Sequence, residues 1–273
     1  MDPGQPEDLE KYYAYYRTVI QNYTMMSDTF MRNMLKDKDC AEFLLRVIME
    51  KPDLKIQSVT VQRDYKNLQG KSSVLDCVAQ DSSGSLYDIE VEQSENGADP
   101  RRARYYSGLL DMNHLRQGQD YSLLKKSFVI FIEETDRIGA GLPVYHIRRI
   151  IQETGGLYHD GTCIIHVNAG LEENTDLGRL VHDFHCSNPA DMYCEILRKR
   201  ANTLKNSPEE VSCMCREMYL IEQRGREEGR MESQRQNVIR MHARGYDVET
   251  IADLLDISCE QVEAWLREAP VSA

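Results

Sequence analysis

The sequence has no long apolar run: no stretch of about 18 apolar residues occurs among its 273 residues, so no membrane-spanning helix is expected. Its acidic N-terminal residues 1–13 lack the basic and apolar regions of a signal peptide, which favours a cytoplasmic protein. The eight cysteines are scattered and include no CxxC pair, which indicates reduced thiols rather than a disulfide framework or a zinc knuckle. A glycine-rich phosphate loop and a Gly-x-Ser-x-Gly nucleophile elbow are also absent.

Positive charge is scarce as well. The chain has 33 basic and 45 acidic residues, which gives a formal net charge of −12. This balance argues against a protein that coats nucleic acid, because such a protein needs a strongly basic face. It does not exclude a nuclease, since a local basic groove can lie on an acidic body and metal ions offset carboxylate charge.

Hydrophobic periodicity predicts an α/β chain. Strand patterns occur over residues 56–62, 73–80, 86–92, 127–133 and 163–167, and a helix pattern occurs over residues 100–117. Further helices are expected to begin near Thr29, after a cap at Ser27 or Asp28, and after a cap at Asp39. Helical patterns return at Asp176 and dominate to the end.

Composition divides the chain into four predicted segments. Residues 1–27 form a polar, tyrosine-rich leader, and residues 28–205 contain the α/β pattern. Residues 206–235 are heavily charged, which is typical of a solvated connecting helix. Residues 236–273 predict short helices resembling a helix-turn-helix.

The strands over residues 73–80 and 86–92 are expected to pair as a hairpin whose turn is centred on Ser83. In that register Asp76 lies directly opposite Glu90. Because strand side chains alternate with a period of two, Asp88, Glu90 and Glu92 share one face, and Asp76 points to the same face.

Two interpretations of this acidic face remain open. Like charges on opposed strand positions repel, and a divalent cation such as Mg²⁺ would compensate them and could activate water for phosphodiester hydrolysis. A solvated outer face of an edge hairpin would carry the same residues. Arginines at positions 101, 102 and 104 begin the next helix, and guanidinium groups bind phosphate well, which favours the first interpretation.

These residues resemble a known family. The run LDCVAQDSSGSLYDIEVEQSENGADPRRARYYSGLLD, residues 75–111, resembles the core of the PD-(D/E)XK nuclease-family transposases, which are related to recombination-promoting nucleases. The likeness continues through GLPVYHI at residues 141–147 and LVHDFHCSNPADMYCEIL at residues 180–197. It spans residues 25–205 approximately, and several separate blocks occur in the same order.

The resemblance implies a restriction-endonuclease-like core, a central mixed sheet flanked by helices, here followed by a helical C-terminal extension. It implies DNA cleavage that depends on Mg²⁺ or Mn²⁺, with Asp76 and Glu90 as metal ligands. It also implies catalytic importance for Glu92 and substrate contacts from Gln93. Arg101, Arg102 and Arg104 are expected to contact the substrate backbone. Many nucleases of this fold act as dimers, so a homo-oligomer is left open.

Glu92 departs from the family pattern, which usually has glutamine here and has lysine in the wider superfamily. A carboxylate cannot donate a hydrogen bond unless it is protonated. Glu92 could be a further metal ligand, or Gln93 could take its place through a bulge, and either would preserve activity. A degenerate scaffold that binds partners through its helical tail is the alternative. An acidic residue on an early helix sometimes completes such sites, and Glu42 is the candidate.

Two other patterns suggest weaker hypotheses. The block from His182 to Cys186 has ligand-type residues at helical spacing, but no second ligand pair lies nearby in the sequence, which favours helix-end packing. The last predicted helix, near residues 259–267, carries more glutamate than arginine. Its composition is therefore at least as consistent with oligomerisation or partner binding as with DNA binding. The apolar face of these helices is expected to be buried; it comprises Ile251, Leu254, Leu255, Val262 and Leu266.

Overall fold

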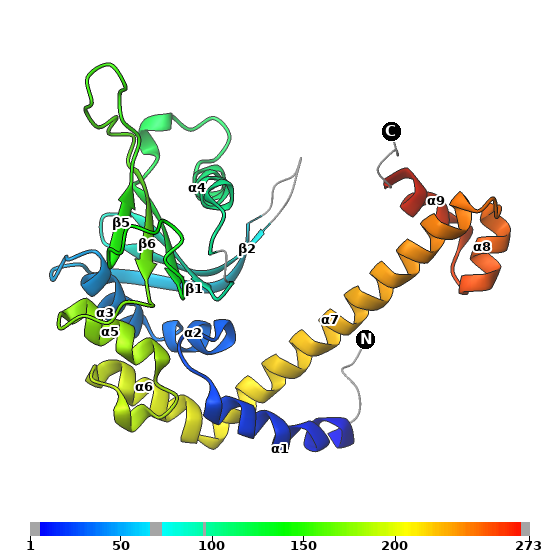
Figure 1. Cartoon of the computed structure of the whole chain (residues 1–273), viewed down its shortest axis with the longest axis horizontal. Helices are drawn as coiled ribbons and strands as arrows, with labels where there is room; N and C mark the ends of the chain where they lie inside the picture. The colour runs from blue at the N-terminus through cyan, green and yellow to red at the C-terminus, as the bar shows by residue number, and fades with distance from the viewer. Residues whose placement is uncertain (1–5, 66–72, 95–96, 269–273) are drawn as a thin grey trace. The chain divides into compact units, whose positions relative to one another are not determined.

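A computed structural model of the chain describes residues 6–65, 73–94 and 97–268 (Figure 1). The strands are β1 Ile56–Tyr65, β2 Ser73–Asp81, β3 Leu86–Glu92, β4 Ser127–Glu133, β5 Val144–Ile147 and β6 Thr162–Asn168. The helices are α1 Pro6–Asn22, α2 Asp28–Leu35, α3 Lys38–Ile48, α4 Pro100–His114, α5 Asp176–His185, α6 Glu195–Asn206, α7 Pro208–Ala243, α8 Val248–Leu255 and α9 Cys259–Glu268. Two short 3₁₀ turns, η1 Tyr121–Leu123 and η2 Pro189–Asp191, connect them.

The strands form one mixed six-stranded sheet in the order β1-β2-β3-β4-β6-β5. β1, β2 and β3 pair in an antiparallel manner, as the predicted hairpin requires. β3, β4 and β6 are parallel, and helix α4 makes the crossover from β3 to β4. Strand β5 was not predicted: it is four residues long and pairs antiparallel with β6 at the edge of the sheet.

Helices cover both sides of this sheet (Figure 1). Helix α4 packs against β4 and β6, and its buried Ala103, Leu109 and Leu110 join Val129 and Phe131 in one hydrophobic core. Helices α2 and α3 pack against β1 on the other side, and α5 and α6 pack against α3. Because β3, β4 and β6 are parallel, their three carboxyl ends lie together at one end of the strands and their three amino ends at the other.

Local caps explain where the helices begin, with one correction. Asp99 caps α4, because its carboxylate accepts the backbone N–H of Arg101 at 2.7 Å. The expected cap at Asp39 is wrong: Asp37 holds that position and accepts the N–H of Asp39 at 2.9 Å. Helix α4 ends at His114, three residues before the predicted end, because Leu115 turns to an extended conformation.

The chain divides into two compact units, one over residues 13–214 and one that combines residues 215–273 with residues 1–12. The predicted boundaries at residues 205/206 and 235/236 stay predictions. Helix α7 runs without interruption through the boundary at 235/236 and through the division between the units at 214/215. No helix among the described residues is both long enough and apolar enough to cross a membrane.

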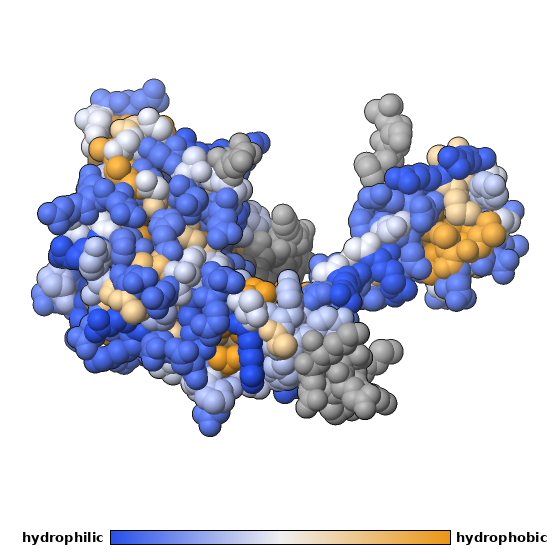
Figure 2. All heavy atoms as spheres, turned by 60° about the horizontal axis from the view of Figure 1, so that its bottom comes forward, coloured by the Kyte–Doolittle hydropathy of each residue, from blue (hydrophilic) through white to orange (hydrophobic). Residues whose placement is uncertain are grey.

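The three C-terminal helices share a small hydrophobic core. Val238 of α7, Ile251 of α8, and Val262 and Trp265 of α9 are buried in it. Asp247 and Ser258 cap α8 and α9 by accepting the N–H groups of residues 250 and 261. Leu254, which belongs to the apolar face expected to be buried, is 60% exposed and is not covered by other described residues of this chain. An apolar patch remains on the surface of these helices (Figure 2).

Candidate functional site

The register of the β2–β3 hairpin places two acidic residues opposite each other. Cys77 pairs with Ile89 and Val78 with Asp88, so the same register brings Asp76 opposite Glu90. The backbone N–H of Asp76 donates a hydrogen bond of 3.0 Å to the Oε1 atom of Glu90. The register predicted from the turn at Ser83 is confirmed by the four residue pairs between β2 and β3, and the contact between Asp76 and Glu90 is a hydrogen bond from backbone to side chain.

The acidic face is buried rather than solvated. Asp88 is 0% exposed and Glu90 is 1% exposed, because α4 covers this side of β3. No N–H group of the described residues donates to either carboxyl oxygen of Asp88, and its hydrogen-bonding neighbour is the carboxyl group of Glu90. A buried polar group without a partner costs free energy, so a solvated edge face is excluded as an explanation of these acids.

Burial changes the proton affinity of this cluster. It raises the pKa of Asp76 to about 8, and the neighbouring charge of Glu90 adds to the effect. Burial and the charge of Glu90 also raise the pKa of Asp88, and burial raises the pKa of Glu90 itself. Clustered carboxyl groups with raised pKa values are typical of functional sites.

Arg102 of α4 supplies positive charge to the cluster. Its guanidinium donates hydrogen bonds to Glu90 at 2.9 Å and to Glu92 at 2.6 Å. Its Nε atom donates to the hydroxyl of Tyr106 at 3.1 Å, and the guanidinium lies 5.3 Å from the ring centroid of Phe131. Arg102 lies in the first turn of α4, after the cap at Asp99, and from there its side chain reaches the end of β3.

Helix α2 contributes two charged residues that the sequence interpretation did not assign to the site. Arg32 is buried, and its guanidinium lies 3.6 Å from the carboxylate of Asp76. Asp28, one helical turn earlier, forms an ion pair with Arg32, and its charge helps to raise the pKa of Asp76. The pairing of an acid and an arginine four residues apart could have suggested their contact, but not their approach to Asp76.

Gln93 explains how α2 is held near the strands. Its side-chain amide donates a hydrogen bond of 2.7 Å to the carbonyl oxygen of Met26, two residues before α2 begins. Gln93 is exposed and follows the last residue of β3. The contact that the structure shows for this residue is therefore to the backbone, and its predicted role toward substrate stays a prediction.

Glu92 lies at the end of β3 and is ionised. Burial acts to raise the pKa of Glu92, but hydrogen bonds from Ser94 and Arg102 outweigh it and leave this pKa below its ordinary value. The backbone N–H of Ser94 donates to one oxygen at 2.9 Å, and Arg102 donates to the other. Both oxygens are thus occupied by donors from this chain.

The remaining predicted residues lie apart from these contacts. Arg101 is exposed and pairs with Asp99, while Arg104 is exposed on α4. Glu42 is buried on α3, where it accepts hydrogen bonds from Lys55 at 3.2 Å and from the N–H of Ile56 at 2.9 Å. Its partners belong to the junction between α3 and β1, and none is a member of the acidic cluster.

A comparison with protein families now bears on this site. Residues 32–147 match the model of the PD-(D/E)XK nuclease family transposases. The matched segment runs from Arg32 through β2, β3 and α4 to the end of β5, and so contains Asp76, Glu90 and Arg102. No curated protein and no solved structure gives a significant match to the chain.

The family match confirms the resemblance and the fold expected from it. The mixed sheet with flanking helices and a helical C-terminal region fits the restriction-endonuclease-like fold of PD-(D/E)XK proteins. The family supports a function related to nucleases or transposases, and a nuclease of this kind acts on DNA. PD-(D/E)XK nucleases generally use divalent metal ions.

The acidic cluster and the two arginines beside it fit such an ion. Five carboxyl groups, those of Asp28, Asp76, Asp88, Glu90 and Glu92, meet the guanidinium groups of two arginines. An excess of negative charge therefore remains when all are ionised, and the buried carboxyl group of Asp88 contributes to it without a cation of its own among the residues described. Carboxylate oxygens are the ligands that Mg²⁺ and Mn²⁺ prefer.

The raised pKa of Asp76 predicts an unusual pH dependence for the metal-free protein. A carboxyl group whose pKa is raised on folding stabilises the native state at low pH, and this stability is lost as the pH rises through the folded pKa, about 8. We therefore expect the free energy of unfolding to fall between pH 5 and pH 8, by up to about 1.4 kcal/mol per pH unit for one proton. Urea denaturation in EDTA at four pH values measures this slope, and a flat or rising profile contradicts the assignment.

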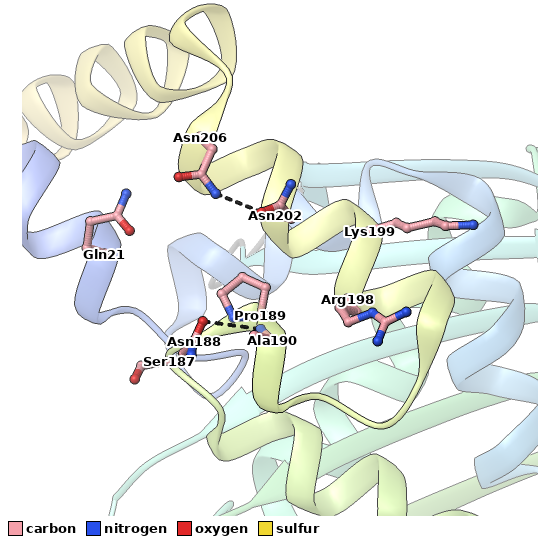
Figure 3. A pocket seen from close by; sticks show the side chains of 9 residues that line it. All are labelled: Gln21, Ser187, Asn188, Pro189, Ala190, Arg198, Lys199, Asn202 and Asn206. Carbon is pink, nitrogen blue, oxygen red and sulfur yellow. Dashed lines mark hydrogen bonds between the residues drawn. The ribbon is translucent and has the colours of Figure 1, made fainter.

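Two other clusters lie outside the acidic site. A polar cavity of about 540 Å³ is lined by amide side chains of Gln21, Asn188, Asn202 and Asn206 and by no carboxylate (Figure 3). Donor atoms from His182, Asp183 and Cys186 lie within 4.8 Å of one another. Both oxygens of Asp183 already accept backbone N–H groups, those of residues 193 and 194, which supports the helix-end packing interpretation.

Proposed function

We propose that this chain is a divalent-metal-dependent DNA endonuclease whose metal ligands are Asp76 and Glu90. The observation that carries the proposal is the buried acidic cluster on β2 and β3, inside the segment that matches the PD-(D/E)XK transposases. The cytoplasmic location and a homo-oligomeric state stay predictions.

The bound cation, Mg²⁺ or Mn²⁺, would supply the charge that activates water and stabilises the pentacovalent phosphate. Asp76 and Glu90 would hold it, and Asp88 lies two residues before Glu90 on β3, with its carboxyl group beside that of Glu90. Asp76 has a raised pKa, so its carboxyl group must release a proton before it can act as a ligand.

Arg102 would supply the positive charge that a lysine of β3 supplies elsewhere in this superfamily. The strand position that carries lysine elsewhere carries Glu92 here, and Glu92 binds the guanidinium of Arg102. A cation from α4 is thereby brought beside Glu90, at the end of the strand where the substrate phosphate would lie. We assign Arg102 to phosphate contact and Glu92 to the orientation of Arg102.

The decisive experiment is a plasmid cleavage assay with the full chain. We expect nicked or linear DNA with Mg²⁺ or Mn²⁺, and no product in EDTA. Calorimetry should detect a divalent cation on the wild type. Absence of both cleavage and cation binding under these conditions would contradict the proposal.

Replacement of Glu92 tests whether this residue orients Arg102 or opposes the binding of substrate. If Glu92 orients Arg102, the Glu92→Gln variant should cut about tenfold more slowly, because a neutral amide binds guanidinium less strongly than a carboxylate does. Initial cleavage rates in Mg²⁺ measure this. Glu134→Gln is the matched control, since Glu134 follows β4 and contacts His185 instead. Faster cutting by Glu92→Gln would show that the glutamate opposes substrate binding.

A catalytically degenerate scaffold is the second candidate. One observation favours it: the guanidinium of Arg102 already engages both Glu90 and Glu92, so one metal ligand is tied to a cation of the chain. In that case the helical tail, with its exposed apolar patch, would carry the function through a partner (Figure 2). Absence of cleavage in the assay above, whether or not a cation binds, would select this alternative.

A further inference from the structure

A second cavity lies at the end of the sheet that is remote from the acidic cluster. Its volume is about 320 Å³, and it is lined by residues just before and at the beginning of β4 and β6, by the end of α3 and by the loop after β5. The acidic residues Glu90 and Glu92 lie at the other ends of these parallel strands, since Glu92 pairs with Glu133, the last residue of β4. The loop between β5 and β6 projects from this end of the unit (Figure 1).

The lining is strongly basic on a chain that is acidic as a whole. Four of the residues that line the cavity are lysine or arginine and two are histidine; they are Lys51, Lys126, Arg148, Arg149, His146 and His159. Asp160 is the one acid among the described lining residues. It forms an ion pair with Arg149 and accepts hydrogen bonds from Thr162, so its charge is already compensated.

The cations of this cavity are arranged by the fold rather than spread along one helix. The side chain of Lys126 lies beside Gly161, because an added Cβ there would meet its Cγ atom at 3.7 Å. The ammonium group of Lys51 lies 5.3 Å from the ring centroid of Phe128, another residue that lines the cavity. The backbone at His159 has a φ of 28°, a conformation that side-chain-bearing residues rarely adopt and that is often found at binding sites.

The basic lining, the volume and the apolar residues of this cavity together indicate the kind of ligand that it would bind. A cluster of arginine and lysine recognises phosphate groups, and arginine does so with paired N–H donors. The volume lies at the lower end of the range for small-molecule pockets, and Met49, Phe128 and Leu157 give it an apolar part. We propose that this cavity binds a phosphate group, carried by a small organic phosphate or by a nucleic-acid strand, independently of the acidic site.

Calorimetry with inorganic pyrophosphate, a mononucleotide and a short DNA duplex, in EDTA at low salt, tests the proposal on the full chain. EDTA keeps metal ions out of the acidic site, so phosphate cannot bind there through a cation. We expect at least one of these probes to bind, and Arg148→Glu and Lys126→Glu each to weaken it about tenfold or more. All the replaced side chains are exposed, and circular dichroism checks that the variants fold.

Two controls make the outcome specific. Lys199→Glu makes the same change of charge at an exposed lysine of α6 outside the cavity, and it should leave affinity unchanged. Asp76→Asn should also bind the probe normally, so loss of nuclease activity and loss of this site can be told apart. Binding of pyrophosphate or the mononucleotide identifies a small-molecule site, and binding of the duplex alone identifies a strand phosphate. If no probe binds, or if Lys199→Glu weakens binding as much as Arg148→Glu, the proposal is wrong.

Discussion

Asp76→Asn is expected to abolish DNA cleavage and, at the same time, to stabilise the metal-free protein at pH 8. The variant keeps the size of the side chain but removes a metal ligand, and loss of a positioned catalytic charge costs roughly 1,000-fold in rate. It also removes a carboxyl group that burial and Glu90 hold at a pKa of about 8. The pH-dependent loss of stability expected for the wild type should therefore be flatter in the variant.

Three measurements on the same samples check this prediction. Plasmid cleavage in Mg²⁺ gives the loss of activity, and urea denaturation in EDTA at pH 5 and pH 8 gives the change in stability. Added Mn²⁺ should raise the midpoint of thermal unfolding of the wild type and not that of Asp76→Asn, because a ligand stabilises only the state that binds it. Equal cation-induced shifts in both proteins would show that Asp76 is not a ligand.

Asp111→Asn is a suitable control for this experiment. Asp111 also has a pKa raised by burial, but it lies near the end of α4, where it accepts a hydrogen bond from Ser127. The substitution should change stability without removing cleavage. A loss of cleavage as large as that of Asp76→Asn would mean that activity follows stability in general rather than metal ligation.

The hairpin was predictable because its information is local. A period of two sets which side chains share a face, and the turn around Ser83 sets the register, so Asp76 and Glu90 follow from a short segment of chain. Strand limits in β3 and β4 agree with the sequence pattern for a similar local reason: β3 alternates acidic and apolar residues, and β4 is a nearly continuous apolar run. The edge strand β5 was missed because four residues with two exposed side chains carry little periodic signal.

The surroundings of the acidic face were not predictable from such patterns. Burial of Asp88 depends on α4 packing over β3, and the approach of Arg32 to Asp76 joins residues 44 positions apart in the chain. The sequence offered three arginines at the start of α4 without a way to choose among them. The structure distinguishes Arg102, which turns inward to Glu90 and Glu92, from its exposed neighbours.

Arg102→Met is expected to damage both folding and activity, and more severely than changes at Arg101 or Arg104. Removal of the guanidinium leaves Glu90, a buried carboxylate, without its cation, and breaking a buried pair in this way costs about 3 kcal/mol or more. Part of the loss comes from packing, because the guanidinium lies against the rings of Tyr106 and Phe131. Thermal and urea unfolding measure the effect, with Arg104→Met as the matched exposed control.

The double variant Arg102→Met with Glu90→Gln separates charge from packing. If the cost of Arg102→Met is mainly the uncompensated carboxylate, adding Glu90→Gln should restore a large part of the stability, and the coupling between the two sites should exceed about 1 kcal/mol. Cleavage should not return, since the double variant lacks both a metal ligand and the phosphate contact. Arg102→Lys keeps the positive charge but not the two-pronged donor, so it should fold nearly normally and cut more slowly. Additive effects of the two substitutions would place the contribution of Arg102 in its packing alone and would remove the argument that it replaces the lysine of the superfamily.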